Sequence, residues 1–196
     1  MTSVLTLSTP RLTFRAMSLD DWPAYFDMPG SDRSRRMGGP FAMEEAWGIF
    51  CSDHAQWQLF GCGALIMDLT DSGKTIGQVG INSGPLFPEP EIGWFLHPGF
   101  EGSGYACEAA MALLHWARGI RQLKRLVSYV KPENERSRNL AVRLGAVRDE
   151  KAARRAPGEL VFCHFGRAST ADACSPKKDR PDVEATLSTA PVPFQM

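Results

Sequence analysis

The residues with the clearest chemical capability lie between Glu91 and Ala110. An apolar stretch, Ile92 to Leu96, breaks at His97-Pro98, and a glycine-rich turn from Gly99 to Gly104 leads into an alanine-rich segment. Glycines let main-chain N–H groups approach a ligand closely, and a helix start adds unpaired N–H donors and a positive dipole end. A strand, a glycine turn and a helix in this order predict a phosphate-binding turn.

Three common phosphate loops can be compared with this turn. Gly99 and Gly104 have the spacing of a P-loop, but Tyr105-Ala106 follows in place of the Lys and Ser/Thr that reach the γ-phosphate and Mg²⁺. Gly102-Ser103-Gly104 begins the dinucleotide fingerprint, but Cys107 stands where its third small residue belongs. The acyl-coenzyme A loop has two glycines that match Gly102 and Gly104, although Gly99 stands where that loop begins with Gln or Arg. A glycine pair alone also fits a plain strand-to-helix turn.

The segments that must position this turn alternate between strand and helix patterns. Thr70-Asp71-Ser72-Gly73 is a hairpin turn, and Gly145 ends a short helix. The expected strands cover residues 5–15, 57–69, 75–82, 91–96, 126–130 and 160–165, and the expected helices cover residues 18–28, 44–54, 105–119 and 137–144. This alternation predicts an α/β fold. We expect one mixed sheet of about six or seven strands with helices on both faces.

Three blocks of the chain resemble the core of the GNAT-superfamily N-acetyltransferases. They are most similar to the branch that includes the ribosomal-protein N-terminal acetyltransferases. The blocks are the opening Thr9-Pro10-Arg11-Leu12-x-x-Arg15; Glu91 to Pro98 followed by Gly102 to Ala109; and Pro132-Glu133-Asn134-x-x-Ser137-x-Asn139-Leu140-Ala141-x-x-Leu144-Gly145-Ala146. Three blocks in the right order are fairly specific, and the resemblance covers roughly residues 7–166.

The resemblance implies a GNAT-like α/β fold. Its single central sheet would be mixed and mostly antiparallel, with a splayed strand pair and helices on both faces. The acyl-coenzyme A N-acyltransferase domain would span residues 1–166. Residues 167–196 are rich in Ser, Thr, Ala, Pro and charge without periodicity, and we expect a flexible C-terminal tail there.

The resemblance also assigns coenzyme contacts. In the family, main-chain N–H groups of the glycine turn hold the pyrophosphate, and the central strand pairs with the pantetheine arm, where a main-chain N–H polarises the thioester carbonyl. An Asn ahead of the short helix adds a contact to the arm, although it also suits a helix cap. The matching positions are Gly102, Ser103, Gly104, Tyr105 and Ala106 for the turn, Trp94, Phe95 and Leu96 for the strand, and Asn134.

Two residues are predicted to be catalytic. Many GNAT enzymes use a Tyr seven residues after the Asn as the acid for the leaving thiolate, but that position is Ala141. Ser137 matches a Ser proposed for the same role in related enzymes, and because a thiol pKa is about 8.5, a hydrogen bond suffices. Glu91 starts the central strand, where its carboxylate could accept a proton from the attacking amine or simply be a solvated strand end.

The predicted reaction is transfer of an acetyl group from acetyl-coenzyme A to a primary amine, either a protein N-terminus or a small molecule, by direct attack. Two alternatives stay open: a non-catalytic acyl-coenzyme A-binding regulatory or interaction protein, and an acyltransferase with a longer donor such as succinyl-coenzyme A. The sequence does not identify the acceptor, whose pocket we expect to form from segments 25–45, 83–90 and 150–160.

Composition narrows the function classes. The formal net charge is zero, so no nucleic-acid or membrane partner is expected. Five cysteines without a C-x-x-C pair indicate a reduced, cytoplasmic protein, and four scattered histidines give no metal spacing, so no metal is expected. The chain, at 43% hydrophobic residues, can bury a sizeable core as one domain, either as a monomer or as a homodimer.

Overall fold

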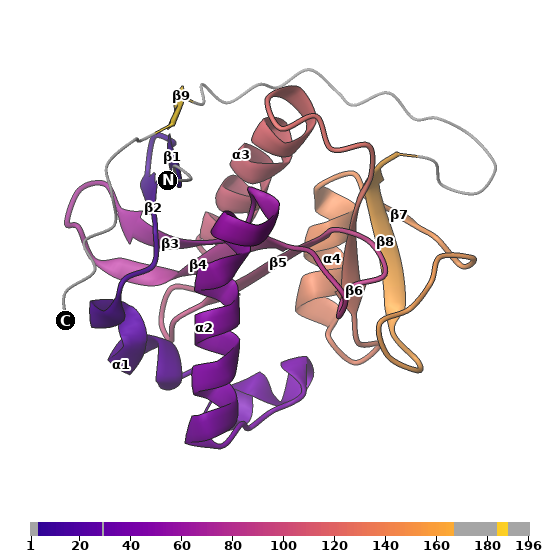
Figure 1. Ribbon diagram of the computed structural model, residues 1–196, viewed down its shortest axis with the longest axis horizontal. Helices are drawn as coiled ribbons and strands as arrows, with labels where there is room; N and C mark the ends of the chain where they lie inside the picture. The colour runs from indigo at the N-terminus through magenta and orange to yellow at the C-terminus, as the bar shows by residue number, and fades with distance from the viewer. Residues whose placement is uncertain (1–3, 29, 167–183, 188–196) are drawn as a thin grey trace.

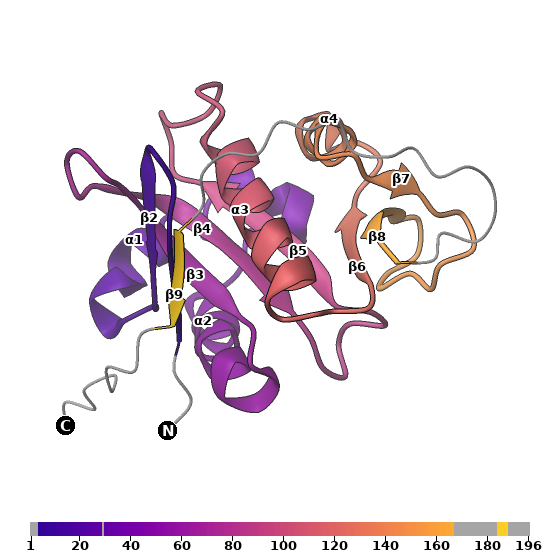
Figure 2. The same ribbon diagram turned by 90° about the horizontal axis from the view of Figure 1, so that it is seen from above.

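The computed structural model describes residues 4–28, 30–166 and 184–187, and its centre is one mixed sheet (Figures 1 and 2). Nine strands follow the order β7-β8-β6-β5-β4-β3-β2-β1-β9. Their bounds are β1 Leu5–Ser8, β2 Leu12–Arg15, β3 Ala64–Leu69, β4 Thr75–Asn82, β5 Glu91–Leu96, β6 Leu126–Val130, β7 Val147–Arg148, β8 Leu160–Phe165 and β9 Glu184–Leu187. Every neighbouring pair is antiparallel except β5 and β6, which are parallel, so the predicted fold class is confirmed.

Helices cover both faces of the sheet (Figure 2). On one face lie α1 (Trp22–Phe26) and α2 (Met43–Phe60), with the 3-10 helices η1 (Leu19–Asp21) and η2 (Asp32–Met37) in the same part of the chain. On the other face lie α3 (Tyr105–Gly119) and α4 (Glu135–Arg143). The alternation of side chains along the strands divides the core accordingly: Leu65 and Met67 pack with the alanines of α3, and Ala64 and Ile66 pack towards α1 and α2.

Strands β5 and β6 separate after one point of contact. β5 pairs with β4 along its whole length, from Glu91↔Asn82 to Leu96↔Gly77, whereas its ladder with β6 consists of the pair Glu91↔Val127. Beyond this pair, the side chain of Ser128 donates a hydrogen bond to the carbonyl of Ile92 at 2.8 Å. The two central strands therefore form a V whose vertex lies at the start of β5, which is the predicted splayed pair.

Some element boundaries differ from the predictions. Residues 5–15 form two strands because Pro10 has no N–H for a ladder and Thr9 closes a turn onto Leu12 at 2.8 Å. The helix predicted over 44–54 continues to Phe60, so the strand predicted from Trp57 begins only at Ala64. The helix predicted over 18–28 is shorter and begins with the 3-10 turn η1. Hence the sheet has more strands than the six or seven expected.

The C-terminal segment contributes one described element. Glu184–Leu187 form β9, which pairs antiparallel with β1 from Leu5↔Leu187 to Ser8↔Glu184 and adds a strand to the sheet. The rest of the predicted tail, residues 167–183 and 188–196, lies outside the described residues.

Candidate active site

The turn between β5 and α3 has the geometry of an anion-binding loop. Gly99, Gly102 and Gly104 have φ values of 88°, 83° and 84°, a left-handed backbone that a side chain would strain. Gly104 is the N-cap of α3, and its carbonyl accepts the first hydrogen bonds of the helix. The N–H groups of Tyr105 and Ala106 precede those bonds and lie at the positive end of the helix dipole.

Arg11, at the corner between β1 and β2, ties the N-terminal hairpin to this turn. Its guanidinium pairs with Glu108 of α3 at 2.6 Å, donates to the Ser103 carbonyl at 3.0 Å and lies 4.7 Å from the centre of the Tyr105 ring. Thr9 donates to the Glu108 carboxylate at 2.6 Å. The opening motif of the chain therefore fixes the glycine turn, a role that its position in the sequence could not reveal.

The register of β5 decides which main-chain groups face the V. The N–H of His97 donates to Ile76 at 2.8 Å, and the N–H of Val127 donates to Pro90 at 3.0 Å. Because successive residues of a strand point their main-chain groups to opposite sides, Phe95 points towards β4, whereas Trp94 and Leu96 point towards β6. Three residues of β5 were predicted to contact the coenzyme. Of these, Trp94 and Leu96 direct main-chain groups into the V. The main-chain groups of Phe95 face β4, and its ring packs on the face of the sheet that carries α1 and α2.

Glu91 is buried at the vertex of the V, not solvated as one interpretation of the sequence proposed. It is 7% exposed, and its carboxylate lies 3.5 Å from the amide nitrogen of Asn82 and 3.8 Å from the guanidinium of Arg155. Burial raises the pKa of Glu91 to about 7, against the opposing attraction of Arg155. A carboxyl group with this pKa can exchange a proton near neutral pH.

Asn134 and Ser137 lie together at the start of α4. The side chain of Asn134 accepts a hydrogen bond from the N–H of Ser137 at 3.2 Å, so the Asn caps the helix. This capping also explains why α4 begins at Glu135, ahead of the predicted start at residue 137. Ser137 is half-buried in the first turn of α4, the helix that follows β6.

A half-buried acid, Asp53 of α2, was not recognised in the sequence. Its carboxylate accepts hydrogen bonds from Tyr25 at 3.2 Å and from the amide of Gln78 at 2.9 Å. Burial raises the pKa of Asp53 to about 6. The only sequence signal was a charged residue within a predicted helix, and such a residue is usually solvated.

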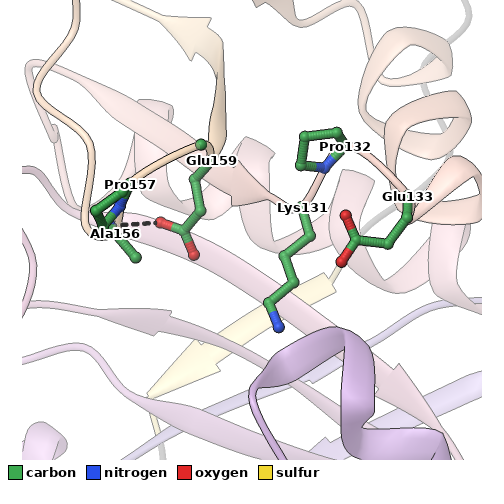
Figure 3. A pocket seen from close by; sticks show the side chains of 7 residues that line it. Lys131, Pro132, Glu133, Ala156, Pro157 and Glu159 are labelled. Carbon is green, nitrogen blue, oxygen red and sulfur yellow. Dashed lines mark hydrogen bonds between the residues drawn. The ribbon is translucent and has the colours of Figure 1, made fainter.

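A pocket of 310 Å³ lies between the loop after β6 and the loop before β8 (Figure 3). Arg155 and Glu159 of the second loop pair at 3.0 Å, and the same Arg155 reaches Glu91. Figure 3 shows Lys131 extending from the first loop, and its ammonium donates to the Arg35 carbonyl in η2 at 3.0 Å. Parts of the predicted acceptor segments 25–45 and 150–160 therefore meet at this end of the sheet.

A serine and a histidine bridge the vertex of the V. Ser128 lies 2.9 Å from Nε2 of His164 and donates its own proton to the Ile92 carbonyl. The Nε2 of His164 therefore carries the proton of this contact. Burial lowers the pKa of His164 to about 4, so the ring is neutral at physiological pH and acts here as a hydrogen-bonding group.

Among residues 4–28, 30–166 and 184–187, no group of three or more His, Cys, Asp or Glu side chains has the arrangement of a metal site. No helix there has the length and apolar character that a membrane span requires.

The fold and the sequence are those of a known family of transferases. The family model described as acetyltransferase (GNAT) domain matches residues 11–147, so the chain belongs to the GNAT acetyltransferase family. A crystal structure of an acetyltransferase from Agrobacterium tumefaciens C58 is 51% identical, with a TM-score of 0.79 over 81% of this chain and 92% of that one.

More distant relatives extend the likeness. An uncharacterised N-acetyltransferase, YnaD of Bacillus subtilis (strain 168), is 26% identical over 147 residues, which are 73% of this chain and 83% of YnaD. A ribosomal L7/L12 α-N-protein acetyltransferase, RimL, solved in complex with coenzyme A, is 17% identical with a TM-score of 0.64 and shares the fold over 82% of this chain and 97% of its own. The resemblance predicted from the sequence is therefore confirmed.

Proposed function

We propose that the protein transfers an acetyl group from acetyl-coenzyme A to a primary amine by direct attack. The observation that carries the proposal is the V between β5 and β6, which pair only through Glu91↔Val127. A pantetheine arm entering this V would lie along the main-chain groups of Trp94 and Leu96. Its pyrophosphate would then reach the glycine turn, Gly102 to Ala106, which follows β5 directly.

In the proposed reaction, the amine nitrogen attacks the thioester carbon and the carbonyl electrons move to oxygen. The N–H of Trp94 stabilises this oxyanion. The C–S bond then breaks, the acetyl group stays on nitrogen, and the thiolate of coenzyme A leaves. Glu91 accepts the proton that the amine loses, directly or through water, and its pKa near 7 suits that task.

Ser137 and Asn134 complete the proposed site from the other side of the V. The hydroxyl of Ser137 donates a hydrogen bond to the departing sulfur, and Asn134, which caps α4, contacts the pantetheine arm. The polar site is fixed before the substrates arrive, so most of the rate enhancement comes from orientation and prearranged dipoles. No metal takes part in this proposal. We place the protein in the cytoplasm, as a monomer or homodimer, with a small molecule or a protein N-terminus as acceptor.

The test combines binding and turnover. Acetyl-coenzyme A at about a hundred times its dissociation constant should raise the melting temperature by about 5–10 °C, whereas NADH and ATP should not. A panel of primary amines with acetyl-coenzyme A should then release free thiol and yield acetylated amine by mass spectrometry. Binding without turnover on any amine would favour the regulatory alternative, and faster turnover with succinyl-coenzyme A would favour a longer donor. An unchanged melting temperature at millimolar coenzyme would refute coenzyme binding altogether.

A further inference from the structure

The group around Asp53 is unusual because its donors are all neutral. Tyr25 and Gln78 supply the two hydrogen bonds to the carboxylate. Among the side chains that the structure describes, no Lys, Arg or His forms an ion pair with Asp53. Glu91, in contrast, has Arg155 beside it. Asp53 is half-buried, and a carboxylate that is partly withdrawn from water costs free energy unless a cation compensates it, so a ligand cation would be favoured at Asp53.

Gln78 adds a second acceptor at the same place. Its side chain is 8% exposed, and while its amide nitrogen donates to Asp53, its amide oxygen is buried without a hydrogen-bond partner among the described residues. Native proteins seldom leave a buried carbonyl oxygen unpaired. An N–H donor from a ligand would satisfy both this oxygen and the carboxylate of Asp53.

These acceptors lie next to the proposed reaction site. Gln78 is the direct partner of Phe95 across β4 and β5, and the ring of Tyr25 contacts the ring of Phe95 at 5.8 Å between centroids. Phe95 and Gly93 lie on either side of Trp94 in β5, and both point towards the face of the sheet that α1 and α2 cover. A Cβ added at Gly93 would meet only Asn82, at 3.8 Å, among the described residues outside its chain neighbours, so the surface over Gly93 is open.

We propose that Asp53 and the amide oxygen of Gln78 bind the ammonium group of the acceptor, beside the open surface over Gly93. This inference rests on the proposed function and adds that the acceptor is recognised as a cation, on the face opposite α3. Aromatic rings continue outward from the site: Phe95 contacts Tyr25, Tyr25 contacts Phe50, and Phe50 stacks on Trp47. Tyr25 and Phe50 are buried within this row, whereas Phe95 is half-buried and Trp47 is 41% exposed, so these two rings offer aromatic surface to an ammonium with an arylalkyl substituent.

The first experiment compares steady-state kinetics of the wild type and Asp53→Asn with 2-phenylethylamine at saturating acetyl-coenzyme A. We expect KM for the amine to rise at least about tenfold, with kcat changed less than about threefold, because ground-state binding of the ammonium is lost while the reacting groups stay. Glu44→Gln removes an exposed acid from the same helix and should match the wild type. Equal KM values for Asp53→Asn and the wild type would overturn the inference and leave the proposed function intact.

The second experiment needs no turnover. Binding of 2-phenylethylamine to the protein saturated with coenzyme A is followed by tryptophan fluorescence, with 2-phenylethanol as the uncharged analogue. We expect the wild type to bind the amine at least about tenfold more tightly than the alcohol, and Asp53→Asn to lose this preference. A preference that persists in Asp53→Asn would refute the subsite. A preference lost in Asp53→Asn by a protein that acetylates no amine would support the subsite and refute the proposed function.

Folding of the variants is checked by circular dichroism. If Asp53→Asn does not fold, Gln78→Met takes its place in both experiments, since it removes the unpaired amide oxygen and leaves the carboxylate. It should weaken amine binding about threefold to tenfold. An unchanged affinity for the amine in a folded Gln78→Met variant would contradict the proposed role of the oxygen.

Discussion

The two faces of the sheet at strands β4 and β5 carry different kinds of chemical groups. Towards α3, apolar side chains pack against fully buried alanines, and the adjoining turn offers main-chain groups held by three glycines of positive φ. Towards α1 and α2, the same strands carry Glu91 and Gln78, and α2 adds Asp53. We propose that the first face binds its ligand through main-chain groups and the second through charged side chains.

This difference predicts which kind of substitution should impair function on each face. The α3 face depends on small residues and on a left-handed turn, so adding a side chain there should distort the turn and weaken binding of the coenzyme. On the α1 and α2 face, two acids have raised pKa values because burial disfavours their charged forms, so an isosteric neutral residue should change activity while leaving the fold intact. Substitutions on each face can therefore test the comparison separately.

The largest effect is expected at the glycine turn. Gly104→Val places a β-branched side chain at φ 84° and at the N-cap of α3, where Arg11 lies 3.5 Å from the new Cβ. We expect the affinity for acetyl-coenzyme A to fall at least about a hundredfold, measured by calorimetry, because the turn must open to relieve the strain. Gly48→Ala, at an uncrowded helical position, is the control and should bind normally. Retained affinity in Gly104→Val would show that the turn does not hold the coenzyme.

The next largest effect is expected from Glu91→Gln. We expect kcat to fall about a hundredfold with coenzyme affinity unchanged, because the amine loses its proton acceptor. In the wild type, kcat/KM should rise with pH and level off above about 7, as Glu91 ionises, and the variant should lose this inflection. A pH profile shared by both proteins would exclude Glu91 as the base.

The same substitution should stabilise the fold. The pKa of Glu91 is higher in the folded state, about 7, than the ordinary value of 4.5, so the folded state binds more protons between these values and stability falls as pH rises through them. Because Gln does not ionise, the free energy of unfolding of Glu91→Gln does not fall in this way as pH rises. We expect its free energy of unfolding to exceed that of the wild type by about 1–3 kcal/mol at pH 8 and to differ little at pH 4, as measured by urea unfolding. A variant less stable than the wild type at pH 8 would contradict the burial argument.

A smaller effect is expected from Arg11→Ala. It removes the ion pair with Glu108 and the hydrogen bond to the Ser103 carbonyl, so the glycine turn becomes less fixed. We expect coenzyme affinity to fall about fivefold to tenfold while KM for the amine stays constant. Arg148→Ala breaks another surface ion pair, with Glu150, and should leave coenzyme affinity unchanged. Equal affinities for the two variants would mean that the N-terminal corner does not organise the turn.

The smallest effect is expected from Ser137→Ala. Its N–H can still donate to Asn134, so α4 remains capped. We expect kcat to fall only about threefold with acetyl-coenzyme A, because a leaving thiol with a pKa of about 8.5 needs little protonation. Loss beyond about a hundredfold would instead make Ser137 an essential acid.

The sequence alone determined the elements whose cause is local. The glycine spacing from Gly99 to Gly104 specified a left-handed turn, because only glycine adopts that backbone without strain. The strands predicted over 75–82 and 91–96 match β4 and β5 to the residue, whereas the helix predicted from Ser137 begins at Glu135, directly after the cap Asn134. The splayed strand pair was predicted from the resemblance of three blocks to a known family, because the periodicity of side chains does not reveal which strands separate.

Only the tertiary structure decided the acceptor side. Asp53, Gln78 and Glu91 are separated along the chain, and nothing local distinguishes them from solvated polar residues. They become a site because α2 packs on β4 and because β4 pairs with β5 in one register. Burial and partnership are long-range properties, and these set the pKa of an acid, whereas the conformation of a glycine turn is set within a few residues.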